Sequence, residues 1–312
     1  WFPLLSPEKR LFIYSHGKRF LLGYDKMLPD VIIAALPSAQ REEEARAQIH
    51  LSLQKNQTID LNYTVFLPWE EGLKILEPTL HSSDAQGRTE ALFAQIEALF
   101  YHREQFPTVL KQLLQRRTEH DGVRKGILFA LIRVPAFFWQ KEHLAYLEEI
   151  IRHGLNDVGL SQETLRAILK LLLRLLPYHF SWCEQQLRVV LRERGFVEPH
   201  PQSENAFASR KVPQLQIAPA LRLELLSLLL PILQTWVQHD KEEESLAVIE
   251  YFAPREPLPE GVADLLSTLL RQTQNAAIAD RALRLLSRHQ PRLFATTLLA
   301  LLQNDASWIT QP

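Results

Sequence analysis

The residues of this chain that could do chemistry are, above all, clustered cations. They are Arg116, Arg117, Arg124, Lys125, Arg281, Arg284 and Arg288. The last three follow the spacing i, i+3, i+7, which places them on one face of a helix. Rows of cations on stacked helices would form a groove that contacts phosphates, so we consider these residues candidate contacts for a partner or for nucleic acid. The structural alternative is that they complement helix dipoles or form a solvated face beside acidic neighbours.

Motifs typical of enzyme active sites are missing from the sequence. It contains no Gly-x-Ser-x-Gly elbow, no phosphate-binding loop and no dinucleotide-binding turn, and its 10 glycines are scattered. Cys183 and His179 lie four residues apart, the spacing of a thiolate–imidazole pair, but Phe180 and Trp182 beside them favour packing. We therefore expect Cys183 to be a small buried residue, and we predict no enzymatic activity and no cofactor.

Histidines could bind a metal ion, and the chain has 11 of them. Zinc sites need three or four ligands at helical or turn spacing. The closest pair here is His143 and His153, ten residues apart, and all other neighbouring pairs are further apart. The sequence therefore predicts no metal site.

Composition and charge narrow the classes of partner. The net charge is −1 and the pI is about 6.9, so no global field draws the chain to nucleic acid or to an anionic membrane. Charged residues and Pro231 interrupt the most apolar stretch, Leu221 to Trp236, which predicts a core helix rather than a membrane span. A single cysteine fits a reducing compartment, so we expect a cytoplasmic protein. Because the chain starts at Trp1, we also expect a piece of a longer protein.

A weak repeat of about 37 residues organises the middle of the chain. Asp84 opens one unit, Asp121 opens the next, and a third ends at Gly195. Leu is frequent and Val is much rarer, which favours helices over strands. Asp121 and Ser161 are expected as helix N-caps. The helices predicted in this region are 85–101, 106–118, 122–133, 141–154, 161–176 and 181–194.

The flanking regions are predicted to be helical too. The first 80 residues are irregular, with helices at 7–15, 30–36, 38–53, 58–66 and 68–76; a hairpin of 11–14 with 19–22 is the alternative to the first helix. Residues 195–218 hold three prolines and few leucines, so they form a long loop, either a flexible insertion or a binding loop. Beyond it, helices are predicted at 219–237, 241–252, 260–273, 275–288 and 291–303.

Two aromatic clusters flank predicted helix ends, at residues 66–69 and 137–139. Exposed aromatic side chains would be suited to anchoring a partner, because such residues dominate interface hot spots. The alternative is that they fill the corners between helices beside Pro68 and Pro135.

The segment Asp121-Gly-Val-Arg124, followed by Ala130-Leu131, resembles the signature of HEAT repeats, in which an Asp in the turn between repeats precedes a Val-Arg pair and an apolar helix. Asp84 to Leu92 and Ala279 to Leu283 are looser copies. The resemblance implies an all-α fold, an α-α superhelix of stacked antiparallel helix pairs. It also implies that Asp84, Asp121 and Arg124 bond across neighbouring repeats in a structural role.

Together these features predict four segments: an irregular helical segment at 1–80, regular HEAT-like repeats at 81–195, a long loop at 196–218 and further repeats at 219–312. We expect a non-enzymatic scaffold or recognition module that binds a protein through the solenoid surface, with no membrane contact. The alternative is a helical-repeat protein that binds nucleic acid through its arginine rows, as helical-repeat DNA glycosylases do.

Overall fold

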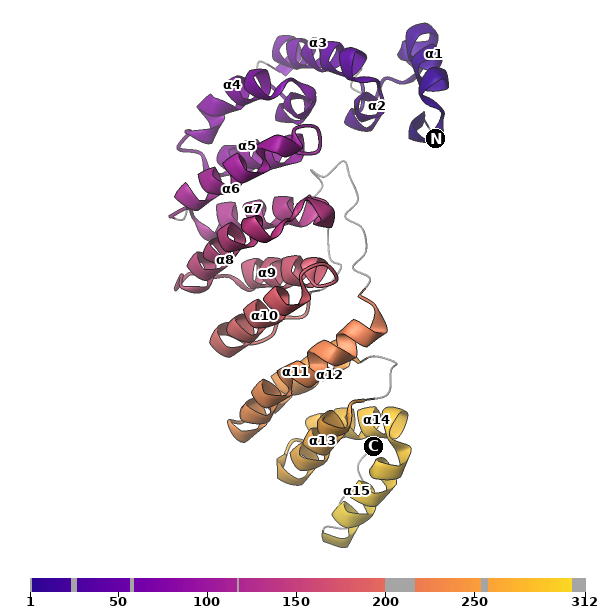
Figure 1. Cartoon of the computed structure of the whole chain (residues 1–312), viewed down its shortest axis with the longest axis vertical. Coiled ribbons are helices and arrows are strands. Elements are labelled where there is room, and N and C mark those ends of the chain that lie inside the picture. The colour runs from indigo at the N-terminus through magenta and orange to yellow at the C-terminus, as the bar shows by residue number, and fades with distance from the viewer. Residues whose placement is uncertain are drawn as a thin grey trace. The chain divides into compact units, whose positions relative to one another are not determined.

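The computed structural model describes residues 2–23, 27–56, 59–116, 118–199, 217–253 and 258–304. The described residues form helices packed against each other, with no strand among them (Figure 1). They divide into two compact units, the first extending through Ile168 and the second beginning at Leu169, with the boundary inside helix α9 (Gln162–Leu175). The all-α prediction is confirmed.

The first unit begins with short elements and continues with longer helices. They are η1 (Phe2–Leu4), α1 (Pro7–Gly17), η2 (Lys18–Phe20), α2 (Asp30–Ala34), α3 (Ser38–Asn56), η3 (Leu61–Phe66), α4 (Trp69–Leu80), α5 (Ala85–Ala98), η4 (Arg103–Gln105), α6 (Phe106–Gln115), α7 (Asp121–Arg133), η5 (Ala136–Phe138) and α8 (Lys141–Leu155). The alternative hairpin at the N-terminus is wrong, because residues 11–14 lie inside α1 and residues 18–20 form η2.

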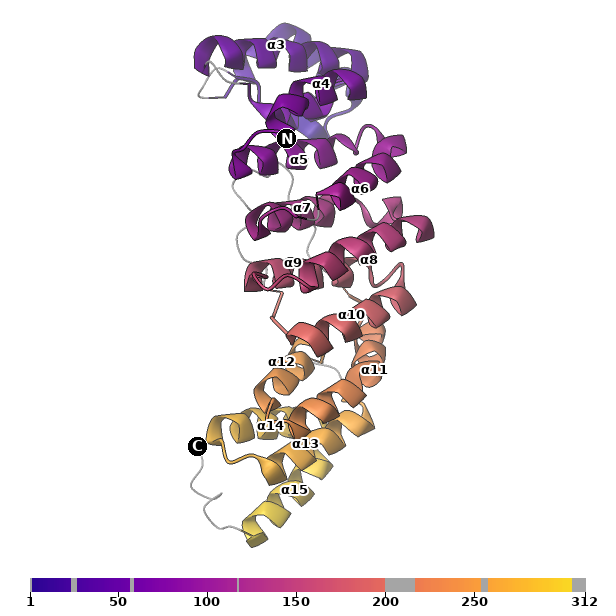
Figure 2. The same cartoon turned by 90° about the vertical axis from the view of Figure 1, so that its left-hand side faces the viewer.

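Helices of the first unit pack in two rows. Helix α5 contacts α4 and α7, and α6 contacts α8 (Figure 2). The 3-10 helix η3 packs against α3, α4 and α5. Side-chain caps start the helices where polar residues allow: Asp84 accepts hydrogen bonds from the N–H groups of Gln86 and Gly87, and Ser161 Oγ accepts one from the Thr164 N–H.

The second unit repeats this pattern with α10 (Phe180–Arg194), α11 (Pro219–Gln238), α12 (Glu242–Phe252), α13 (Glu260–Gln272), α14 (Ala276–His289) and α15 (Pro291–Asn304). One row holds α11, α13 and α15, and the other holds α12 and α14, each helix packing on the next member of its row. Most of the predicted loop, residues 200–216, lies outside the described residues.

Helix α11 is long and apolar enough to cross a membrane by length and composition. In the second unit it packs against α10, α12 and α13, and the leucines of one face are buried. Its other face is largely polar and exposed, with Glu224, Ser227 and Gln234. Such a division is the pattern of a helix packed inside an all-α unit.

Helix α1 contains no buried residue, and polar bonds to Glu44 from its Tyr14 and from Lys18 of η2 join this segment to α3. The Glu44 carboxylate of α3 accepts hydrogen bonds from Tyr14, from Lys18 at 2.5 Å and from Gln48 at 2.5 Å, and it is 2% exposed. Burial alone would raise the pKa of Glu44, but the bonds from Lys18, Tyr14 and Gln48 outweigh it, so the pKa lies below its usual value.

The lowered pKa of Glu44 predicts acid-sensitive anchoring of α1. A depressed folded-state pKa contributes stability that is present above the unfolded pKa and disappears as the pH falls through the folded value. We expect Glu44→Gln to lower the free energy of unfolding by about 1–3 kcal/mol at neutral pH, and the difference from wild type to shrink below about pH 4. Urea unfolding across pH 3–7 measures this difference in the free energy of unfolding. The control is Glu43→Gln, at the exposed neighbouring position. A pH-independent difference would contradict the assignment.

Candidate functional site

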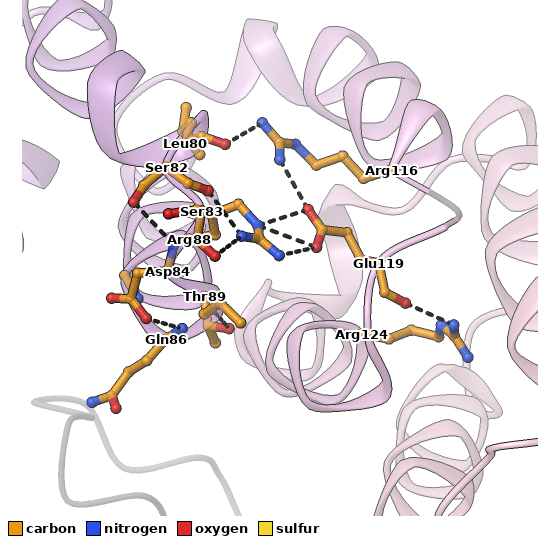
Figure 3. A network of polar contacts seen from close by, with 12 residues as sticks. Leu80, Ser82, Ser83, Asp84, Gln86, Arg88, Thr89, Arg116, Glu119 and Arg124 are labelled. Carbon is orange, nitrogen blue, oxygen red and sulfur yellow. Dashed lines mark hydrogen bonds and ion pairs between the residues drawn. The ribbon is translucent and has the colours of Figure 1, made fainter.

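Two of the predicted contact arginines take part in a polar network in the first unit, which ties α5 and α6 to the turn before α7 (Figure 3). Glu119 is its centre: the Arg88 guanidinium binds its carboxylate with Nη2 at 2.7 Å, and Arg116 Nη1 binds it at 3.2 Å. Arg88 also donates to the carbonyls of Ser82 and Ser83, at 2.8 and 2.9 Å. Burial raises the pKa of Glu119, but hydrogen bonding to Arg88 outweighs this, so the net pKa is lowered.

The guanidinium groups of Arg116 and Arg124 donate hydrogen bonds to other residues of the first unit. Arg116 Nη2 donates to the Leu80 carbonyl at 3.0 Å. Arg124 is 9% exposed and donates to Asp157 Oδ2 at 2.7 Å and to the Glu119 carbonyl at 2.9 Å. The two arginines therefore join elements of the first unit, and their guanidinium groups are not presented as a basic row.

Other cations of the predicted set lie in different settings. Lys125 is half-buried on α7 and forms no ion pair with another described residue. Arg117 lies outside the described residues. In the second unit, Arg281 binds Glu250 through two bonds at 3.1 and 2.6 Å, and Arg284 pairs with Asp280 four residues earlier at 2.8 Å. Arg288 is exposed.

The prediction that Asp121 is an N-cap is wrong. Helix α7 begins at Asp121, and His120 takes the N-cap position without a side-chain bond. The His120 carbonyl accepts hydrogen bonds from the N–H groups of Val123 and Arg124 at 3.0 and 3.1 Å, so the first helical turn starts one residue earlier than expected. Asp121 Oδ1 is buried and has no hydrogen-bond partner among the described residues.

Cys183 and the histidines are the residues considered above for catalysis and metal binding. Cys183 is fully buried, as expected, and burial raises the pKa of its thiol to about 12, so the thiolate is not formed near neutral pH. Among the described residues, no group of three or more His, Cys, Asp and Glu side chains is close enough to hold a metal ion.

A cavity of about 580 Å³ lies in the first unit, at the meeting of η3 with α4, α5 and α7. We call it the η3–α5 cavity. Its volume is within the range of about 300–1,000 Å³ that is typical of pockets for small ligands. Its lining residues are Ile59, Asp60, Leu61, Asn62, Ile75, Pro78, Thr79, Thr89, Glu90, Phe93 and Gly126.

The walls of the η3–α5 cavity are apolar and its rim is acidic. Ile75 and Phe93 are half-buried, whereas Asp60 and Glu90 are exposed. The Asp60 carboxylate accepts a hydrogen bond from the Asn62 N–H at 3.0 Å, and Glu90 accepts one from Gln86 at 3.1 Å. Sequence reasoning missed this cavity, because its lining residues come from four elements and follow no motif.

Close packing of α5 on α7 at the cavity wall depends on Gly126. A Cβ atom at this position would lie 2.3 Å from Thr89 Cγ2, whereas a Cβ at Gly122 of the same helix meets nothing within 4 Å. We expect Gly126→Ala to destabilise the unit by about 1–3 kcal/mol through overpacking. Gly122→Ala should instead stabilise it by up to about 1 kcal/mol, because Ala favours helix. Thermal unfolding of the Gly126→Ala and Gly122→Ala variants measures both effects. Similar stabilisation by the two changes would contradict the close contact between Gly126 and Thr89.

Comparison of the chain with protein-family models, with curated proteins and with solved structures finds no match.

Proposed function

We propose that this chain is an α-solenoid of HEAT or armadillo type and acts as a non-enzymatic recognition module that binds a segment of a partner protein. The observation that carries the proposal is the combination of an open apolar cavity with arginines that are used internally. A helical array of this kind presents an extended surface, and its function depends on which parts of that surface remain free.

The solenoid part of the proposal is supported by the way polar bonds recur. In the first unit, Arg88 with Glu119, Arg124 with Asp157 and Arg133 with Glu97 join residues 31, 33 and 36 positions apart. In the second unit, Arg281 with Glu250 and Gln290 with the Leu258 carbonyl join residues 31 and 32 apart. Each separation is close to one helix pair, as expected when each pair bonds to the next.

Protein binding is favoured over nucleic-acid binding by the placement of the cations. Arg116 and Arg124 were expected to contribute to a basic row, but both donate to carboxylates and carbonyls of the first unit. The η3–α5 cavity instead has apolar walls and two exposed carboxylates. The carboxylates would repel a phosphate backbone.

A display experiment tests the proposed function. Fragments of the source organism's genome are displayed on phage and selected on the purified chain, and each selected fragment is then measured by calorimetry. We expect fragments that bind saturably at one site and that crosslink to helices of the described units. The proposal fails if no fragment binds saturably. A gel shift at about 50 mM salt, where counterion release favours nucleic-acid binding, tests the alternative.

A further inference from the structure

We propose that the η3–α5 cavity receives the apolar part of a partner protein segment whose neighbouring residues are Lys or Arg. This inference rests on the proposed function and specifies the chemistry of the segment. It is carried by three observations: an apolar interior, two carboxylates without ion pairs at the rim, and walls that are already fixed in place.

Apolar side chains from different elements line the interior. Leu61 comes from η3, Ile75 from α4 and Phe93 from α5, with Ile59 just before η3. All four are half-buried, so each keeps apolar surface in contact with the cavity. Removing such surface from water is favourable, and an aliphatic or aromatic side chain of a partner would do so.

The rim carboxylates differ from their neighbours in having no cation. In the same unit, Glu97, Glu119 and Asp157 each bind an arginine at 2.6–2.7 Å. Asp60 and Glu90 form no ion pair within the described part of the chain, although both line the cavity and both are exposed. Two uncompensated anions at the mouth favour a cationic flank on the incoming segment and disfavour an acidic one.

Fixed walls reduce the cost of binding. The Arg133 guanidinium lies 5.4 Å from the centre of the Phe93 ring and binds Glu97 at 2.6 Å, so an ion-paired group packs beside the Phe93 wall. The contact of Gly126 with Thr89 holds α5 close to α7 on another side. Walls positioned in advance lose little conformational freedom when a ligand enters.

A library of decapeptides in four pools tests the class of partner. The central position is either Leu, Ile, Met or Phe, or else Ser, and the flanks are either Lys and Arg or Asp and Glu. Pools are incubated with the immobilised chain at about 50 mM salt, where charge contributes most. We expect the pool with apolar centre and cationic flanks to be retained at least about tenfold over each other pool. Equal retention of the four pools, or preference for acidic flanks, would overturn the inference.

Variants then place the binding in the cavity. Peptides from the retained pool are measured by fluorescence anisotropy against Phe93→Ala, Asp60→Asn and Glu90→Gln. We expect Kd to rise about 2–5-fold for each carboxylate change and by at least about 10-fold for Phe93→Ala. Glu70→Gln, an exposed residue of α4 that does not line the cavity, is the control and should bind as the wild type does. Circular dichroism verifies that each variant is folded.

The outcomes separate the inference from the proposed function. If genomic fragments bind the chain but are unaffected by Phe93→Ala, Asp60→Asn and Glu90→Gln, the cavity is not the site, and the recognition function stands. If neither the fragments nor any peptide pool binds, both proposals fail. If the four pools fail while fragments bind and lose affinity in the variants, the cavity is a binding site but the assigned chemistry of its partner is wrong.

Discussion

Replacing Glu97 with alanine is expected to lower the free energy of unfolding by about 3–5 kcal/mol, since breaking a buried ion pair leaves a charge without compensation. Glu97 lies on α5 and Arg133 on α7, at 8% and 6% exposure, and Arg133 Nε donates to Glu97 Oε1 at 2.6 Å. Without the carboxylate, the guanidinium remains inside the unit and has lost its ion pair with Glu97.

Chemical denaturation with hydrogen exchange on α5 and α7 measures this loss. The matched control is Glu149→Ala, because Glu149 pairs with Arg152 at 50% and 60% side-chain exposure and an exposed pair contributes about 0–1 kcal/mol. The double variant Glu97→Leu with Arg133→Met should recover most of the stability, because an apolar pair of similar volume replaces both charges. A Glu97→Ala variant as stable as Glu149→Ala would contradict the buried pair.

Phe106→Ala is expected to cost about 3–5 kcal/mol, the range for removing a fully buried phenylalanine. Phe106 is 1% exposed at the start of α6. Its ring centroid lies 4.9 Å from that of Trp139 and 4.8 Å from that of His143, both in edge-to-face geometry. Burial lowers the pKa of His143, in agreement with a dry environment around this cluster.

Phe137→Ala in the same aromatic cluster is the control for Phe106→Ala. Phe137 is 63% exposed, so its truncation should change stability by only about 0.5 kcal/mol. Thermal unfolding followed by near-UV circular dichroism reports on the aromatic packing directly. If the two variants lost stability equally, the buried position assigned to Phe106 would be wrong.

Local sequence signals were sufficient to predict most helices. Pro107, Pro219 and Pro291 lie at or beside helix starts, where a missing N–H costs nothing, and the predicted helices at 106–118, 219–237 and 291–303 are confirmed within a few residues. The helix predicted at 58–66 is instead the 3-10 helix η3 from Leu61, whose first turn is capped by Asp60. Because this short segment lacks strong helical periodicity, tertiary packing decides which type of helix it forms.

The candidate site was much harder to predict. Clustering of Arg116 and Arg124 was visible in the sequence, but their partners Glu119 and Asp157 depend on how one helix pair is placed against the next. The η3–α5 cavity needs residues 59–62 and Gly126 to come together, a separation that no local pattern encodes. The aromatic cluster at 137–139 divides: Phe138 and Trp139 are buried as corner fillers, and Phe137 is exposed.

The bonds that recur at separations of 31–36 residues have a consequence for how this chain can vary. Arg133 and Glu97 join two helices directly, whereas Arg88 and Arg124 bind carboxylates that lie in turns, at Glu119 and Asp157. A turn can therefore gain or lose residues at small entropic cost only where the change leaves its carboxylate facing the same arginine. What recurs among the described residues is the separation between two bonded residues, and the repeat in the amino-acid sequence is much weaker.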